Sequence, residues 1–193
     1  MEDLPLTRFH HDPLNPVELL LAGRLQLEAA TALLRFDGAG RVQRLLHRMK
    51  YRGDRQVGIE LGRLLGTELS TCERFSQVDA VLAVPLHRSK ERMRGYNQSQ
   101  LLVDGLLGSW PLTDLRGTVL RTRRTQSQTR KNRDQRWRNV SEAFLVKDEQ
   151  CVTGRHVLLL DDVVTTGATI GSLAAVLLEL PGTRVSIAAL AHA

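Results

Sequence analysis

Residues 157–171 read VLLLDDVVTTGATIG, and this stretch decides the fold. The apolar run 157–160 predicts a strand that is buried on both faces, as the strands of parallel sheets are. Two aspartates and a turn rich in threonine follow it, and an apolar helical pattern then runs over 170–180. A strand, a turn and a helix in this order predict an α/β protein that binds its ligand where the strand ends.

The turn 165–169 has the composition of a phosphate-binding loop. Threonine hydroxyls, backbone N–H groups and the positive N-terminal end of the next helix can all contact an anion. Gly167 carries no Cβ, so the backbone can curl closely around the ligand. We therefore predict that a phosphate group binds to the five residues of the turn, which are Thr165, Thr166, Gly167, Ala168 and Thr169.

Asp161 and Asp162 stand shortly before this turn. Carboxylates repel a phosphate but accept hydrogen bonds from hydroxyl groups, so we expect them to bind vicinal ribose hydroxyls, directly or through a metal ion and water. Neighbouring strand residues point to opposite faces, and both aspartates can face one sugar only if the strand ends here. The predicted ligand is a 5-phosphorylated ribose. The alternative is a solvated strand end followed by an ordinary Thr/Gly turn.

The hydrophobic pattern predicts further elements on both sides of this motif. Strands are expected at 78–84, 119–122, 142–146 and 184–190, and helices at 17–34, 42–49, 57–69 and 97–107. Asn97 is expected to cap the last of these helices, and a basic loop is expected over 86–95. We predict a doubly wound parallel sheet, with residues 1–76 as an N-terminal helical cap and residues 77–193 as the core.

Basic residues gather in the second half of the chain. The net charge is +6, and the polar segment 123–139 is dense in arginine. Such a long polar segment between two predicted strands is typical of a lid that closes over a bound diphosphate. Binding of the same charges to a DNA backbone is the less favoured alternative.

The composition excludes several classes of protein. No apolar run approaches the roughly 20 residues that cross a bilayer, and the N-terminus lacks the pattern of a signal peptide. Two isolated cysteines, Cys72 and Cys151, form no paired motif for zinc and no disulfide framework. We expect a cytoplasmic protein without membrane segments and without zinc.

Several blocks of the sequence resemble a known family. VLLLDDVVTTGAT is similar to the phosphoribosyl-diphosphate (PRPP) motif of type I phosphoribosyltransferases. The blocks MKYRGDR (49–55), VPLHRSKERMRGYNQSQLL (84–102) and RTRRTQSQTRKNRDQRWRNVSEAF (121–144) resemble the ComF/GntX branch of these proteins. Members of this branch commonly begin with a cysteine-rich zinc ribbon, which has no counterpart in this sequence.

The resemblance implies a type I phosphoribosyltransferase fold that binds PRPP with Mg²⁺. It makes 86–95 the loop that contacts pyrophosphate. The expected catalytic residues are Asp161, Asp162, Arg130 and Lys131, with the two aspartates as candidate Mg²⁺ contacts. The expected pyrophosphate contacts are His87, Arg88, Ser89 and Lys90, and further site residues are Arg94, Asn97 and Arg133.

Two functions from different classes follow from this resemblance. The first is transfer of phosphoribose to an unknown acceptor, linked to DNA uptake or to sugar-acid use. The second is a non-catalytic module that binds PRPP or a nucleotide and acts through protein partners of the competence machinery or through DNA. No segment has residue types that identify an acceptor, and a homodimer stays open.

Overall fold

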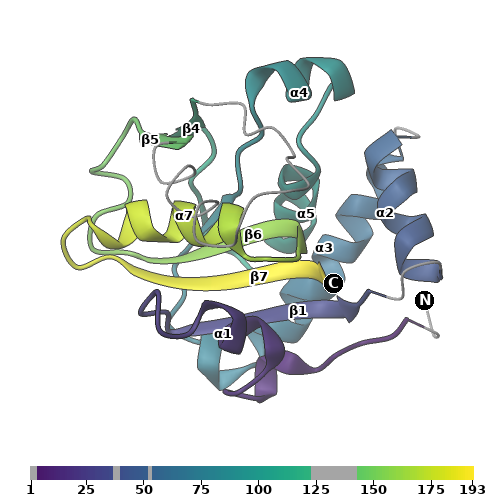
Figure 1. The fold of residues 1–193 in the computed structure, drawn as a ribbon, viewed down its shortest axis with the longest axis horizontal. Helices are drawn as coiled ribbons and strands as arrows, with labels where there is room; N and C mark the ends of the chain where they lie inside the picture. The colour runs from purple at the N-terminus through teal and green to yellow at the C-terminus, as the bar shows by residue number, and fades with distance from the viewer. Residues whose placement is uncertain (1–3, 37–39, 52–53, 123–142) are drawn as a thin grey trace.

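A five-stranded parallel sheet forms the centre of the molecule (Figure 1). The computed structural model describes residues 4–36, 40–51, 54–122 and 143–193. The strand order is β1-β7-β6-β2-β3, and every pair of neighbours is parallel. The strands are β1 (Ala29–Arg35), β2 (Ala80–Ala83), β3 (Thr113–Asp114), β6 (His156–Val164) and β7 (Arg184–His192). The predicted α/β class with a parallel sheet is confirmed.

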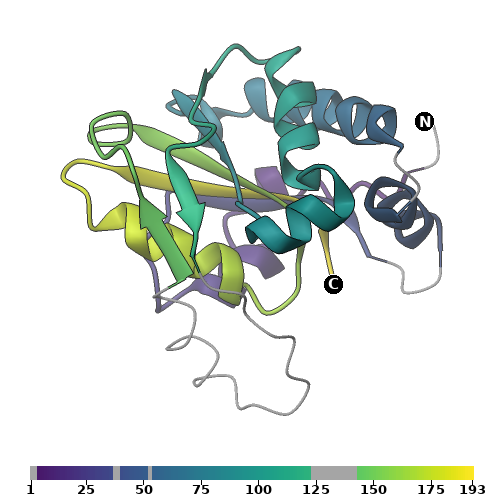
Figure 2. The same cartoon turned by 90° about the horizontal axis from the view of Figure 1, so that it is seen from above.

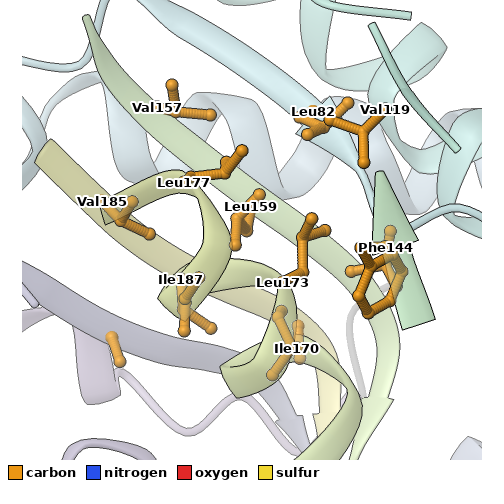
Figure 3. Packing of buried hydrophobic residues seen from close by; sticks show 14 of the residues in the cluster. Leu82, Val119, Phe144, Val157, Leu159, Ile170, Leu173, Leu177, Val185 and Ile187 are labelled. Carbon is orange, nitrogen blue, oxygen red and sulfur yellow. The ribbon is translucent and has the colours of Figure 1, made fainter. Parts of the chain in front are cut away.

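Helices cover both faces of the sheet, as a doubly wound fold requires (Figure 2). One face packs against α1 (Pro16–Leu21) and α7 (Ala168–Leu178). Figure 3 shows Ile170, Leu173 and Leu177 of α7 close to Leu159 and Ile187. The other face packs against α2 (Arg41–Tyr51), α3 (Arg55–Ser70) and α5 (Gln98–Leu107). The core is therefore two apolar layers with the sheet between them.

Helices α3 and α5 approach each other at glycines. A Cβ on Gly62 would lie 2.1 Å from the carbonyl oxygen of Leu102, and a Cβ on Gly105 would lie 1.9 Å from that of Ile59. Both positions leave no room for a side chain, so the two backbones are in direct contact. This contact fixes where the N-terminal end of α5 lies, which matters for the site described below.

The prediction of a helix over 17–34 is wrong. Only Pro16–Leu21 is helical, and the side chain of Asn15 caps it by accepting from the N–H groups of Val17 and Glu18. Residues 29–35 form β1 at one edge of the sheet, paired with β7. Six of its seven residues are buried. A short apolar run that is buried on both faces shows no alternation, which made it indistinguishable from a buried helix.

The region 1–76 therefore contributes a strand to the main sheet as well as the predicted helices. The boundary between residues 76 and 77 stays a prediction. Two short 3₁₀ helices, at Phe9–His11 and Glu73–Phe75, complete this part of the chain. Among the described residues, no helix is both long and apolar enough to cross a membrane.

Two predicted strands form a separate structure. The segments β4 (Val119–Arg121) and β5 (Phe144–Val146) pair antiparallel with each other and stay outside the main sheet. Phe144 packs in the core against α7 (Figure 3). The pair of strands β4 and β5 therefore lies beside the face of the sheet that α7 covers.

Candidate functional site

The carboxyl ends of β2 and β6 meet the N-terminal end of α5 at one edge of the sheet. Asn97, which precedes α5, donates from Nδ2 to the carbonyl oxygen of Val84 at 3.0 Å. Ser99, in the first turn of α5, donates from Oγ to Oδ1 of Asp161 at 2.9 Å. Asn97 and Asp161, two residues of the predicted site, thus lie near each other where ligands of open α/β sheets bind.

The sequence predicted that the strand ends at the two aspartates, but β6 does not end there. It continues to Val164 and stays paired with β7 as far as His192. However, the alternation of faces shifts along this stretch. Leu160 and Val163 pack in the same apolar layer, whereas strict alternation would place them on opposite faces. The aspartates lie within this shift.

Asp161 is a half-buried acid that accepts hydrogen bonds from two donors. Its Oδ1 accepts from Ser99 Oγ and from the backbone N–H of Asp162, both at 2.9 Å. Burial, and secondly the neighbouring charge of Asp162, raise the pKa of Asp161 to about 7. Arg121, on β4, interacts electrostatically with this carboxylate, while burial lowers the pKa of the guanidinium. A hydroxyl group or a cation brought to Asp161 would stabilise its charged form.

Asp162 forms an ion pair with a residue that the sequence reasoning did not select. Nζ of Lys50, at the end of α2, lies 2.7 Å from Oδ2 of Asp162. The two side chains are only 23% and 16% exposed, so water screens this pair less than a surface pair. Lys50 belongs to the block MKYRGDR, and Ser99 belongs to the block around RGYNQSQ. Their place in the blocks that carry the family resemblance was the one signal in the sequence that could have identified Lys50 and Ser99 as site residues.

The phosphate turn leads directly into α7. Gly167 has φ +69°, in the left-handed region that glycine adopts without strain, and the helix begins at Ala168 instead of near Ile170. Within the described part of the chain, the backbone N–H groups of Thr169 and Ile170 have no acceptor. Among the described residues, one side-chain acceptor is given for the N–H groups of the first turn, a long contact of 3.5 Å from Ala168 N to Thr166 Oγ1. These donors remain open to an anion.

The predicted pyrophosphate loop is a short helix, α4 (Arg88–Arg94), and not an irregular loop. His87 caps it, because Nδ1 accepts from the backbone N–H of Ser89 at 3.2 Å. Gly95, with φ +82°, ends it. Arg94 donates to Oε1 of Gln98 at 2.8 Å and so points toward α5. The sequence did not predict this helix, because the segment is basic and because a His at the N-cap and a Gly at the C-cap indicate a helix only weakly.

Asn97 caps α5 as predicted. Its Oδ1 accepts from the N–H of Ser99 at 3.1 Å while its Nδ2 binds Val84. Both ends of the amide are therefore used to join α5 to β2. These hydrogen bonds position the start of α5, and Asn97 also lines the cleft described below.

A cleft of about 420 Å³ lies between α4, α5 and β4. Arg88, Tyr96 and Arg121 line it together with an apolar floor that includes Leu82 and Leu101. Neither the phosphate turn nor the aspartate pair is part of its lining. Three predicted site residues, Arg130, Lys131 and Arg133, lie outside the described residues, as does the predicted lid over 123–139.

The aspartate pair suits a hard divalent cation that brings most of its own ligands. No group of three or more His, Cys, Asp or Glu residues could hold a metal within the residues that the structure describes. Two adjacent carboxylates can offer oxygen ligands to Mg²⁺, which otherwise keeps water and substrate phosphates as ligands. The donors present therefore fit Mg²⁺ bound through a diphosphate.

The parallel sheet, its helices on both faces and the site at its carboxyl edge define an α/β protein with a type I phosphoribosyltransferase-like fold. No protein-family model matches the chain. Over 154 residues it is 33% identical to DNA utilization protein YhgH of Escherichia coli (strain K12), covering 78% of this chain and 67% of the relative.

Two further relatives carry names that refer to competence. Competence protein F of Haemophilus influenzae is 30% identical over 153 residues, covering 77% of this chain and 67% of that protein. Competence protein ComFC of Bacillus subtilis is 28% identical over 141 residues, covering 69% and 52%. The chain therefore belongs to the ComF family.

Proposed function

We propose that this protein binds PRPP together with Mg²⁺ at the carboxyl edge of β6 and transfers its phosphoribose to an acceptor. One observation carries the proposal. Two adjacent, half-buried carboxylates lead within a few residues to a helix whose first N–H groups are open. A phosphate on one side and sugar hydroxyls on the other match these two kinds of group.

Each part of the ligand has a proposed partner. The turn 165–169 and the N-terminal end of α7 would hold the 5-phosphate. Asp161 and Asp162 would bind the ribose hydroxyls, directly or through Mg²⁺ and water, and Ser99 would orient Asp161. Arg88 and Lys90 of α4 would face the pyrophosphate, and Mg²⁺ bound through the diphosphate would neutralise its charge as it leaves C1.

The names of the relatives suggest the cellular process in which this protein acts. Proteins called competence protein F, ComFC and DNA utilization protein YhgH share its family. We propose that this protein likewise acts in the uptake or use of DNA. The alternative within the same process is a module that binds PRPP without turning it over and acts through protein or DNA partners.

The binding proposal is tested by replacing both aspartates, Asp161→Asn with Asp162→Asn. The ligand hydroxyls would lose charged acceptors, at about 1.5–3 kcal/mol for each bond, so PRPP–Mg²⁺ binding measured by calorimetry should weaken strongly. The matched control is Asp148→Asn with Glu149→Gln, which removes two charges from an exposed segment. Equal affinity in the wild type and the site variant would refute the proposal.

A second experiment separates the enzyme from the binding module. Release of pyrophosphate from PRPP is measured with Mg²⁺ while nitrogenous bases and amines are supplied as acceptors. Turnover that disappears in the double aspartate variant identifies a transferase. If PRPP binds but no pyrophosphate is released with any of these acceptors, the protein is the non-catalytic binding module.

A further inference from the structure

Lys50 and Asp162 are joined although they lie far apart in the sequence. The 2.7 Å between Nζ and Oδ2 is the distance of a charge-assisted hydrogen bond, and both side chains are largely buried. The pair connects the last turn of α2 to the end of β6. It therefore lies within the proposed site.

The position of Lys50 is fixed by its neighbour. Met49 is fully buried, and its carbonyl oxygen accepts from the hydroxyl group of Tyr96 at 2.7 Å. Tyr96 itself stands between α4 and α5, one residue before the cap of α5. The end of α2 is thus joined to the same segment that positions Ser99, and this contact restrains the backbone from which Lys50 reaches Asp162.

We propose that Lys50 is a stand-in cation, which neutralises Asp162 in the ligand-free protein and is displaced when the metal-bound ligand arrives. The inference rests on the proposed function, because it assumes that this carboxylate pair faces a ligand that carries a metal. Lys50 carries a single positive charge on a flexible side chain, and its ammonium group lies where a divalent ion would bind Asp162.

The physical consequence is discrimination against the bare metal. A divalent cation that binds to Asp162 alone must break the ion pair and is then repelled by the ammonium group nearby. A metal that arrives with a diphosphate brings negative charge of its own, and the displaced ammonium is attracted to it instead. Lys50 would therefore make the binding of metal and diphosphate interdependent.

Binding of Mn²⁺ alone, followed by electron paramagnetic resonance, tests the proposal without any turnover. Lys50→Met should bind Mn²⁺ about tenfold more tightly than the wild type, because the competing charge is gone. Lys50→Arg should restore the weak affinity of the wild type. Adding Asp162→Asn to Lys50→Met should remove the gain.

The same helix offers a matched control. Arg48 forms an ion pair with Asp54 at 2.5 Å, and Arg48→Met removes an equal charge two residues away. It should change Mn²⁺ binding less than about twofold, since Arg48 is half exposed and pairs with Asp54 instead of a site aspartate. Lys50→Gln serves as the second variant if Lys50→Met does not fold, because it keeps a donor without the charge.

Unchanged or weaker Mn²⁺ binding in folded Lys50 variants would overturn the stand-in role. That outcome is distinct from a failure of the proposed function, which is measured by PRPP–Mg²⁺ binding in the double aspartate variant. A gain of equal size in Arg48→Met would likewise overturn it, since any nearby cation would then have the same effect.

Discussion

The folded structure disfavours the charged form of the Asp161 side chain. Burial and the adjacent Asp162 raise its pKa from the ordinary 3.8 to about 7, and the peptide N–H of Asp162, the hydroxyl group of Ser99 and the charge of Lys50 oppose this. Near neutral pH, the side chain is then divided between its two forms. A group in this state responds strongly to whatever approaches it, as residues at binding and catalytic sites do.

This raised pKa predicts a pH dependence of stability. The folded state holds a proton on Asp161 that the unfolded chain releases above about pH 4. Its contribution to the free energy of unfolding is therefore fully present below about pH 4. This contribution is lost as the pH rises through about 7, by a total on the order of 4 kcal/mol.

Replacing Asp161 with asparagine should remove this dependence and stabilise the protein above pH 7. Urea unfolding of the wild type and of Asp161→Asn, from pH 4 to 8, measures the difference. The histidines change stability over part of this range, but they are common to both proteins and cancel. Parallel curves for the two proteins would contradict the prediction.

At the scale of the elements, α5 depends on α3 for its place. Ser99 binds Asp161 from the first turn of α5, and the close contacts at Gly62 and Gly105 help to set the position of this helix against α3. An added Cβ at Gly105 would collide with the backbone at Ile59, and no side-chain movement can relieve this. The shape of the site is therefore coupled to a contact on the opposite end of α5.

Gly105→Ala should accordingly destabilise the fold by about 2 kcal/mol or more and weaken PRPP–Mg²⁺ binding as α5 is pushed outward. Gly108→Ala is the control, because its Cβ would lie 3.2 Å from the carbonyl oxygen of Gly105 and 4.0 Å from Nε of Arg63, with no contact as close as the one at Gly105. Denaturant midpoints and calorimetry of both variants check the prediction. Equal midpoints for the two variants would show that the close contact is not required.

Much of the fold could be predicted from the sequence, and the misses have physical reasons. The DDVVTTG motif placed the acids, the turn and α7 together because neighbouring residues must be close. β1 was missed because its burial on both faces removed the periodicity on which the prediction depended. Lys50 and Ser99 were missed as site residues because their contacts with the aspartates bridge distant segments.

On the scale of the whole molecule, residues 77–193 should not fold without residues 1–76. β7 pairs with β1, and α5 packs on α3, so the shorter fragment would expose one side of a central strand and the glycine face of a helix. The fragment should show no cooperative thermal transition, and adding the segment 1–76 should restore one. Independent cooperative unfolding of the fragment would support the predicted domain boundary instead.

The pairing of β1 with β7 also has a consequence for synthesis on the ribosome. Ala30 leaves the exit tunnel long before its partner Ile187 has been made. Until then, a buried apolar segment has no sheet edge to join, and contacts between such distant residues form slowly. The nascent chain is therefore exposed to aggregation for most of its translation, and we expect chaperones to bind it through the first strand.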